Sequence, residues 1–373
     1  MSEIVGAASW SRAWLRVLSG GRGQRQLIAL TAALFLVFSL AAPTVFPSPL
    51  NLQSMAMQFP EVGLLALGVM LAMVAAGIDL SVVATADLSG LVATLFLHAA
   101  GAKGTGADPV LLTIVALAIA LAVGAACGAF NGILIGRLGI TPIVATLATG
   151  YLYGGAAIVL TGGQAVVGLP HSFLLLGETV LDVPVPLLVF ALGALLAGVL
   201  LNRMGLGLAL SLLGENASAA RYAGIEQPRV LLSTYMATGI LAALAGILFV
   251  ARTASATPDY GSSYVFLSIV ICVLAGVDLV GGFGTVAGVI VATICLEIVE
   301  SGFNILGLSQ FLYQVAQGTI LAGVMALRLV PARGARQSPW RRWARRRVAP
   351  TGDSHDAFAT TPGQPGGQDG GAD

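Results

Sequence analysis

The sequence predicts an all-α, polytopic integral membrane protein. Hydrophobic residues make up 57% of its 373 residues and charged residues only 9%, whereas roughly a quarter of the residues of a soluble domain are charged. Several apolar runs reach about 20 residues, the length of a helix that crosses a bilayer. Basic residues also fall mostly in alternate connections between these runs, which is typical of a multi-pass protein.

About ten segments are long and apolar enough to be spans, and roughly eight of them cross if two are broken, re-entrant helices. The first follows several arginines, as a signal peptide would, but its apolar stretch is too long for a signal and more spans follow. We therefore expect it to remain as an anchor. The expected spans are residues 26–46, 61–76, 82–100, 110–130, 141–161, 185–202, 230–251, 264–280, 284–303 and 309–330.

Lysine and arginine indicate the orientation, because cytoplasmic connections are enriched in both. With a cytoplasmic N-terminus and ten crossings, every basic residue except Lys103 and Arg252 falls on the inner side. The sequence therefore predicts that both termini are cytoplasmic. It also places the connection between the sixth and seventh spans, residues 203–229, in the cytoplasm.

The spans divide the chain into three regions. Residues 1–25 are expected to form a cytoplasmic N-terminal segment, and residues 26–330 a transmembrane domain. Residues 331–373 form a tail that begins with the basic, tryptophan-containing run RQSPWRRWARRR. Such a run suits an anionic inner leaflet, and its place directly after a span argues against nucleic acid as its partner. The rest of the tail, rich in Gly, Pro, Gln and Asp, is predicted to be disordered.

The connection at 203–229 contains GENASAARYAGI, residues 214–225, a polar stretch between two apolar runs. Asn216 is a good helix N-cap and Gly224 suits the left-handed residue that ends a helix. Between them, 217–223 are expected to form a helix about 10 Å long. Its small, alanine-rich face suits close approach by another protein, while a loop helix that only connects two spans is the alternative. The expected docking residues are Gly214, Glu215, Asn216, Ala219, Ala220, Arg221 and Gly224.

A short internal repeat suggests two discontinuities in the helices. AGIDL at 76–80 is followed by VAT, and AGVDL at 275–279 is followed by VAT at the same distance. Asp79 and Asp278 follow a glycine at the end of an apolar run, so both lie either in cytoplasmic turns or in broken helices that line a polar path. The residues expected along a translocation path are Asp79, Ser81, Asp87, Asn131 and Asp278.

Asp87 is the most exceptional of these because it lies inside an apolar run. Ionisable groups within spans are expensive and usually face the bundle interior or a water-filled cavity. We expect Asp87 to face the path and to bind a polyhydroxylated solute, the alternative being a carboxylate that reaches the nearer headgroups. Glu297 and Glu300, one helical turn apart, suit a position at the outer rim or along the path.

No catalytic or metal site is predicted. A Walker A motif needs a lysine after glycine, but the only lysine, Lys103, follows Ala102. GFGTVA at 282–287 matches a dinucleotide motif yet opens a span, so we assign it to helix packing. Glycines spaced by four also predict close helix packing. These residues are Gly124, Gly128 and Gly132, then Gly150 and Gly154, and then Gly284, Gly288 and Ala292. The cysteines and histidines show no metal-ligand spacing; they are Cys127, Cys272, Cys295, His98, His171 and His355.

Taken together, the motifs resemble the permeases of bacterial ATP-driven sugar importers, the ribose-type branch of the ABC superfamily. The pattern G-x-N-x-x-A-A-R-x-x-G-I at 214–225, AGIDLSV at 76–82 and NGILIGRLGITPIVATLATG at 131–150 all fit. LTGG at 160–163 and SGFNILGLSQF at 301–311 also match, so the resemblance covers roughly residues 26–330. The chain departs from the family pattern at Val83, where glycine is usual, and at Asp87, where a small apolar residue is usual.

The resemblance implies a type II importer-like permease in the bacterial inner membrane, carrying a sugar or sugar-like solute. A binding protein outside the cytoplasm would deliver the solute, and a second permease subunit would complete the membrane unit. ATP and Mg²⁺ would bind a separate ATPase subunit, whose cleft receives the docking helix, so this chain would bind no cofactor and would not be an enzyme. From the residues alone, an ion-gradient-driven transporter or channel using Asp79, Asp87 and Glu297 remains the alternative.

Overall fold

The computed structural model describes residues 22–102, 108–180 and 183–329. Nearly all of the predicted N-terminal segment, Lys103 and the predicted tail lie outside the described residues. By its internal contacts the chain divides into units 1–324 and 325–373. Of the second unit, only the end of one helix is described.

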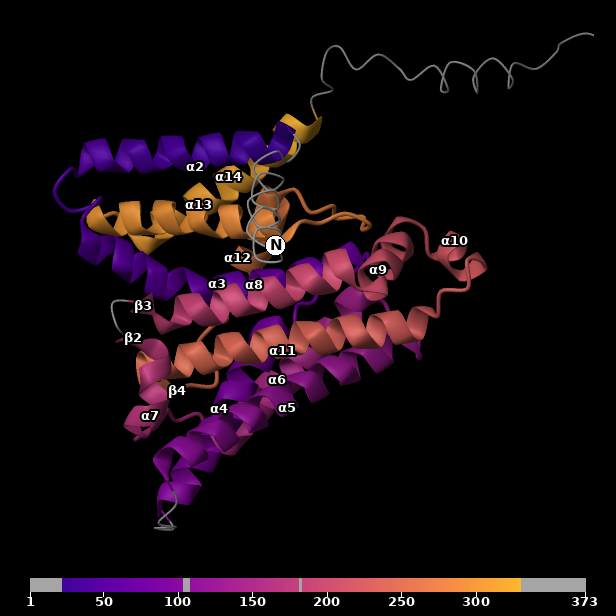
Figure 1. Cartoon of the computed structure of the whole chain (residues 1–373), viewed down its shortest axis with the longest axis horizontal. Helices are drawn as coiled ribbons and strands as arrows, with labels where there is room; N and C mark the ends of the chain where they lie inside the picture. The colour runs from indigo at the N-terminus through magenta and orange to yellow at the C-terminus, as the bar shows by residue number, and fades with distance from the viewer. Residues whose placement is uncertain (1–21, 103–107, 181–182, 330–373) are drawn as a thin grey trace, which may run out of the picture. The chain divides into compact units, whose positions relative to one another are not determined.

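Every predicted span contains a helix, and eight described helices are long and apolar enough to cross a membrane (Figure 1). The count agrees with the expected range. These eight are α2 (Arg22–Ala41), α3 (Pro49–Val74), α4 (Val82–Ala102), α5 (Pro109–Gly136), α6 (Pro142–Thr161), α8 (Val185–Arg203), α11 (Gln227–Thr253) and α13 (Val286–Ile305). The shorter or terminal helices are α7 (His171–Leu174), η1 (Leu175–Gly177), α9 (Gly205–Glu215), α10 (Ala217–Tyr222), α12 (Tyr264–Ala275) and α14 (Gln310–Leu329).

Two short β-ribbons lie at the end of the bundle opposite α9 and α10 (Figure 1). In the first, β1 (Val166–Val167) pairs antiparallel with β4 (Ser255–Ala256). In the second, β2 (Thr179–Val180) pairs antiparallel with β3 (Val183–Pro184). The first ribbon ties the α6–α7 connection to the end of α11, so two distant parts of the chain form one surface.

The first predicted boundary that the structure corrects is the start of α3. The helix begins at Pro49 instead of residue 61, and Ser48 caps it by accepting a hydrogen bond from the Asn51 N–H. Polar side chains such as Gln58 interrupt the apolar run there, so the apolar pattern alone does not predict the first turns of α3. Pro60 lies inside the helix and is buried, which membrane helices tolerate because neighbouring helices support the weakened turn.

The second corrected boundary is the end of α12. The helix stops at Ala275, with Gly276 in the left-handed region at φ 90°, so the apolar run that reaches residue 280 is only partly helical. Its twelve residues are too few to cross a bilayer as a helix. The discontinuity predicted at the second AGxDL motif is therefore present.

Close packing of α5 on α11 holds the centre of the bundle. A side chain added at Gly124 would overlap the Gly239 carbonyl oxygen, and one added at Gly128 would overlap the Tyr235 carbonyl oxygen. Small residues allow this approach where no hydrophobic force drives membrane helices together. The glycine prediction is confirmed for α5, but it is wrong for Gly154, beside which a Cβ would meet nothing within 4 Å.

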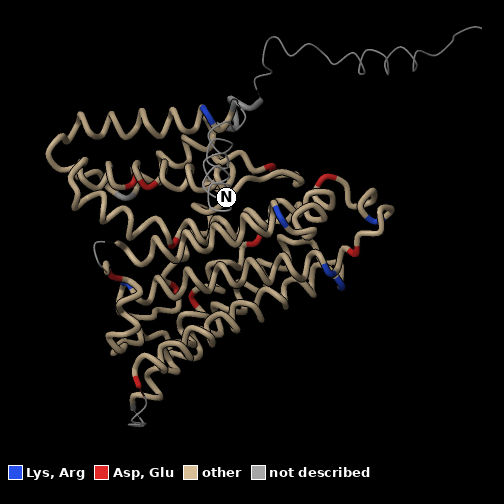
Figure 2. The backbone as a smooth tube through the Cα atoms, viewed as in Figure 1, with Lys and Arg blue, Asp and Glu red and all other residues tan. Residues whose placement is uncertain are grey.

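Arginine is concentrated at one end of the bundle. Arg203 ends α8 just before α9, and Arg137 and Arg221 line one cleft. Figure 2 shows most of the blue, basic positions at the end of the bundle that carries α9 and α10. Arg252 lies in the last turn of α11, at the other end of that helix from the docking segment. Assignment of the arginine-rich end to the cytoplasm remains a prediction, supported by the positive-inside rule.

Candidate functional site

The predicted docking segment folds as its sequence suggests. Asn216 is extended, at φ −157° and ψ 99°, and its Oδ1 accepts a hydrogen bond from the Ala219 N–H at 3.0 Å. Gly224 closes the helix at φ 79°, and the Ile225 N–H donates to the Ala220 carbonyl at 3.0 Å. Both caps are confirmed, and α10 ends at Tyr222 instead of at residue 223.

One side of α10 is open and the other is packed. Tyr222 is 95% exposed, and Arg221 and Gly224 are also exposed. Ala220 is only 3% exposed, so its place on an approachable face is corrected: it packs inward. The outward surface of α10 is therefore polar and aromatic, and the alanine-rich face is only partly available to another protein. The other predicted docking residues divide into exposed Glu215, Asn216 and Ala219 and buried Gly214.

Gly214 braces the docking segment against the rest of the bundle. A Cβ there would overlap the Val74 carbonyl oxygen at the end of α3 and would crowd the Gly282 nitrogen. The Gly282 N–H itself donates to the Val74 carbonyl at 2.9 Å. The last turn of α9 therefore packs against the end of α3, next to the first AGxDL motif, and against Gly282, just after the second AGxDL motif.

An open cleft separates the docking segment from the turn between α5 and α6. It has a volume of about 620 Å³ and is lined by Arg137, Arg221 and Gln227, among others. The Arg221 Nη2 donates to Gln227 Oε1 at 3.4 Å. Polar, exposed walls beside a projecting helix suit a docking surface, because the rim of a protein interface is polar and solvent-accessible.

The first helix break is a buried polar cluster. Residues 75–81 are not helical, and the Asp79 Oδ1 accepts hydrogen bonds from the Ser81 hydroxyl at 2.6 Å and the Ser81 N–H at 2.9 Å. The Asn131 Nδ2 donates to the Ser81 hydroxyl oxygen at 2.7 Å. Asp79, Ser81 and Asn131 are each at most 2% exposed. Three of the predicted path residues therefore lie in one cluster that joins the break to α5.

A threonine satisfies the backbone that this break leaves free. Thr146 of α6 accepts from the Leu80 N–H at 3.1 Å and donates to the Ile78 carbonyl at 3.1 Å. Buried backbone groups without partners are costly, and this contact supplies partners at the point where the helix stops. The break is consequently fastened to both helices of the α5–α6 hairpin.

The second break repeats the turn of the first without its burial. The Asp278 Oδ1 accepts a hydrogen bond from the Val280 N–H at 2.9 Å, the same two-residue turn that Asp79 makes with Ser81. Asp278 is exposed, however, whereas Asp79 is buried. The repeated AGxDL sequence therefore forms the same aspartate turn in both places, but one aspartate is buried and the other is exposed. A path role for either remains a prediction.

Asp87 lies buried on α4, where the connection between α11 and α12 folds against it. Asp87 is only 8% exposed. Its carboxylate faces the backbone N–H of Gly261, and Asp259 lies nearby. A Cβ at Gly261 would contact Val83, which places the two positions that depart from the family pattern against the same loop. Whether Asp87 binds solute stays a prediction.

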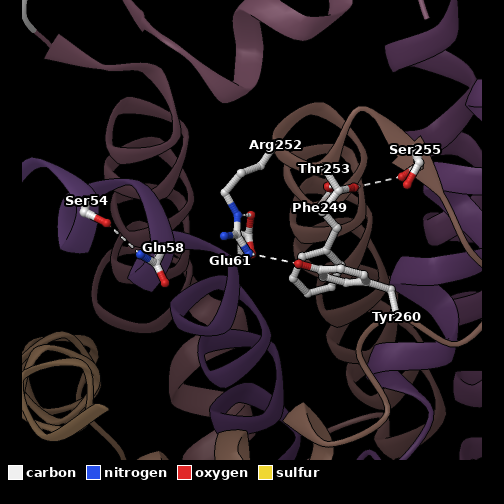
Figure 3. A network of polar contacts seen from close by, with 8 residues as sticks. All are labelled: Ser54, Gln58, Glu61, Phe249, Arg252, Thr253, Ser255 and Tyr260. Atoms are coloured by element: carbon white, nitrogen blue, oxygen red, sulfur yellow. Dashed lines mark hydrogen bonds and ion pairs between the residues drawn. The ribbon is translucent and has the colours of Figure 1, made fainter. Parts of the chain in front are cut away.

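Sequence analysis missed a buried ion pair between α3 and α11. The Arg252 Nε lies 2.6 Å from Glu61 Oε1, and its Nη2 lies 2.8 Å from Glu61 Oε2 (Figure 3). Arg252 also donates to the Tyr260 hydroxyl at 3.0 Å; burial raises the pKa of Tyr260, so this phenol stays neutral and accepts. The sequence signals for this pair were Glu61, a lone glutamate in an apolar run, and Arg252, an arginine assigned to the outer end.

Comparison with protein families identifies the chain. Residues 51–327 match the family model described as "Branched-chain amino acid transport system / permease component". This match covers more than half of the chain and includes the docking segment and both breaks. The chain belongs to this permease family.

Three curated relatives are 29–34% identical to the permease over the aligned residues. It is 34% identical to the ribose import permease protein RbsC of Bacillus subtilis over 291 residues, covering 77% of this chain and 87% of the relative. It is 32% identical to the autoinducer 2 import system permease protein LsrD of Yersinia enterocolitica, covering 72% and 80%. It is 29% identical to the D-allose transport system permease protein AlsC of Escherichia coli, covering 80% and 89%. No solved structure matches it significantly.

Family membership decides between the two classes of transporter that the residues left open. The permease is the multi-pass membrane component of an ABC importer, and ATP is hydrolysed by a separate subunit. The predicted resemblance is thereby confirmed. The interpretation as a self-contained, ion-driven transporter or channel is set aside.

Proposed function

We propose that this permease imports a neutral sugar or sugar-like solute across the bacterial inner membrane. The names of its relatives specify ribose, D-allose and autoinducer 2, and these names support the substrate class. The observation that carries the mechanism is the contact of Gly214 with the ends of both helix breaks. It gives a partner subunit a direct mechanical route from α10 into the bundle.

The proposed cycle begins at the end with the β-ribbons. A binding protein delivers solute to connections that include residues 162–184 and 252–263, and an ATPase subunit holds α10 at the opposite end. Closure of the ATPase moves α10 and, through Gly214, the segments after α3 and α12. Because coupling between two binding sites is reciprocal, a loaded binding protein also stimulates ATP hydrolysis. A second permease subunit presents a second α10 to the second ATPase.

ATP dependence tests this function directly. Uptake of ¹⁴C-labelled D-ribose and D-allose is measured in membrane vesicles that contain the complete importer, first with ATP and then with ATP removed while ion gradients are kept. We expect uptake of at least one sugar with ATP and none without it. Uptake that persists without ATP contradicts the proposal, as does an ATP-dependent importer that carries neither these sugars nor a related neutral polyol.

The docking role of α10 predicts the effect of a double variant. Arg221→Glu reverses an exposed charge, and Gly224→Val places a branched side chain at φ 79°, a conformation that β-branched residues avoid. We expect ATPase activity stimulated by the binding protein to be abolished while the protein still inserts into the membrane. The measurement combines ATPase assays in proteoliposomes with quantification of the inserted chain.

Arg25→Glu is the matched control for this variant, because Arg25 is exposed at the start of α2 and lies outside the docking segment. It is expected to keep stimulated ATPase activity. If Arg221→Glu with Gly224→Val abolishes insertion, or if Arg25→Glu is equally inactive, α10 has only a structural or general electrostatic role.

A further inference from the structure

A second cavity lies between the beginning of α3, the end of α13 and the beginning of α14. Its volume is about 330 Å³, at the lower end of the roughly 300–1,000 Å³ typical of small-molecule sites. The end of α3 at Val74 contacts the docking segment, so the beginning of the same helix lies at the opposite end of the bundle. The cavity therefore belongs to the end where the binding protein is proposed to dock.

Two polar helix faces form the walls of this cavity. Asn51, Ser54 and Gln58 follow one face of α3, spaced by three and four residues. Glu297, Glu300, Ser301 and Asn304 follow one face of α13 with the same helical spacing. Polar stripes inside a membrane bundle are expensive and are kept mostly where they face a cavity or a pathway.

The side chains in the cavity provide both donors and acceptors. The Ser301 hydroxyl donates to Asn51 Oδ1 at 3.0 Å, and the Gln58 Nε2 donates to the Ser54 hydroxyl at 2.8 Å. Among the described residues, the Glu297 carboxylate makes no hydrogen bond or ion pair. A carboxyl oxygen accepts, and an amide both donates and accepts, so the set suits a ligand rich in hydroxyl groups.

The cavity offers no partner for an anion. Glu297 and Glu300 both line it, and among the described residues no lysine or arginine does. The nearest guanidinium acting on them, that of Arg252, already binds the Glu61 carboxylate with two nitrogens. Phe303 and Tyr313 add aromatic surface, with ring centroids 6.2 Å apart. Apolar walls with a few placed polar groups are the usual composition of a small-molecule site.

We propose that this cavity is a solute site of the permease itself, which receives a neutral, polyhydroxylated solute after the binding protein releases it. Glu297 and Glu300 accept hydrogen bonds from solute hydroxyls, Gln58 and Asn304 supply donors at the exposed mouth, and the two rings contact the apolar face of the solute. The proposal rests on the import of sugar-like solutes proposed above. It adds a selectivity step in the membrane that excludes phosphorylated or carboxylated solutes.

Thiol labelling of Ser54→Cys in the full chain tests the site without relying on transport. Ser54 is exposed at the cavity, and the three native cysteines are buried, so an impermeant maleimide added to right-side-out vesicles reports on the new thiol. D-ribose or D-allose at about twice its dissociation constant is expected to slow labelling about threefold, because only the empty site reacts. D-ribose 5-phosphate is expected to give no protection. Glu178→Cys, exposed at the same end and outside the cavity, is the control and should be labelled at a rate unaffected by sugar.

The outcomes separate this inference from the proposed function. Absence of protection by any neutral sugar, or protection by sodium or calcium chloride in place of sugar, overturns the solute site even when ATP-dependent uptake is intact. In the complete importer, Glu297→Gln is expected to raise the KM for uptake about tenfold, since it replaces a hydrogen-bond acceptor of the site with an amide donor. ATPase activity stimulated by the binding protein is measured on the same vesicles, and an equal loss of both activities shows that Glu297 is only structural.

Discussion

Glu61→Gln is expected to lower the free energy of unfolding by about 3–5 kcal/mol, because it leaves the Arg252 guanidinium buried without its counter-charge. The glutamate is 1% exposed and the arginine side chain 24% exposed. Both nitrogen–oxygen contacts, at 2.6 and 2.8 Å, are lost or weakened together. This pair joins α3 to α11 at the end opposite the docking segment, so its loss should loosen the outer half of both helices.

Thermal unfolding of the purified permease in detergent, followed by intrinsic fluorescence, measures this effect. Glu226→Gln is the matched control, because Glu226 and Arg229 form an ion pair of similar length, 2.9 Å, with the Glu226 side chain 60% and the Arg229 side chain 79% exposed. Exposed pairs contribute at most about 1 kcal/mol. The reversed pair, Glu61→Arg with Arg252→Glu, should recover part of the lost stability. Equal effects of Glu61→Gln and Glu226→Gln are incompatible with a buried, stabilising pair.

Features encoded by neighbouring residues could be predicted from the sequence. The docking helix is one case: Asn216 and Gly224 act on backbone groups within a few residues, so their roles follow from local geometry alone. The two helix breaks are another, because each aspartate forms a turn with the residue two positions later. Span positions also followed from composition, since the bilayer fixes the required length and polarity.

Features that depend on distant contacts could not be predicted. Glu61 and Arg252 are 191 residues apart, and nothing local to either specifies the other. Burial of Ala220 depends on how α10 packs on its neighbours, so helix periodicity alone left its direction open. The polar stripe of α3 escaped notice because it precedes the expected span, and only the fold brings it against the stripe of α13.

Gly128→Ala is expected to destabilise the permease by about 1–3 kcal/mol, the range for overpacking a well-filled core. A Cβ at Gly128 overlaps the Tyr235 carbonyl oxygen, and backbone cannot move aside as a flexible side chain can. Relief requires α5 and α11 to separate along the crossing that Gly124 and Gly239 also share. The double change Gly124→Ala with Gly128→Ala should therefore have the larger effect.

Gly155→Ala on α6 distinguishes packing from helix propensity. Gly155 is exposed and a Cβ there meets nothing within 4 Å, so alanine should be neutral or stabilise the helix by about 0.5–1 kcal/mol. Thermal unfolding of the three variants in the same detergent decides the matter, and a destabilising Gly155→Ala or a neutral Gly128→Ala refutes the packing account. α11 follows directly from the docking segment, so in the proposed transport cycle this crossing is the contact that connects α10 to the α5–α6 hairpin.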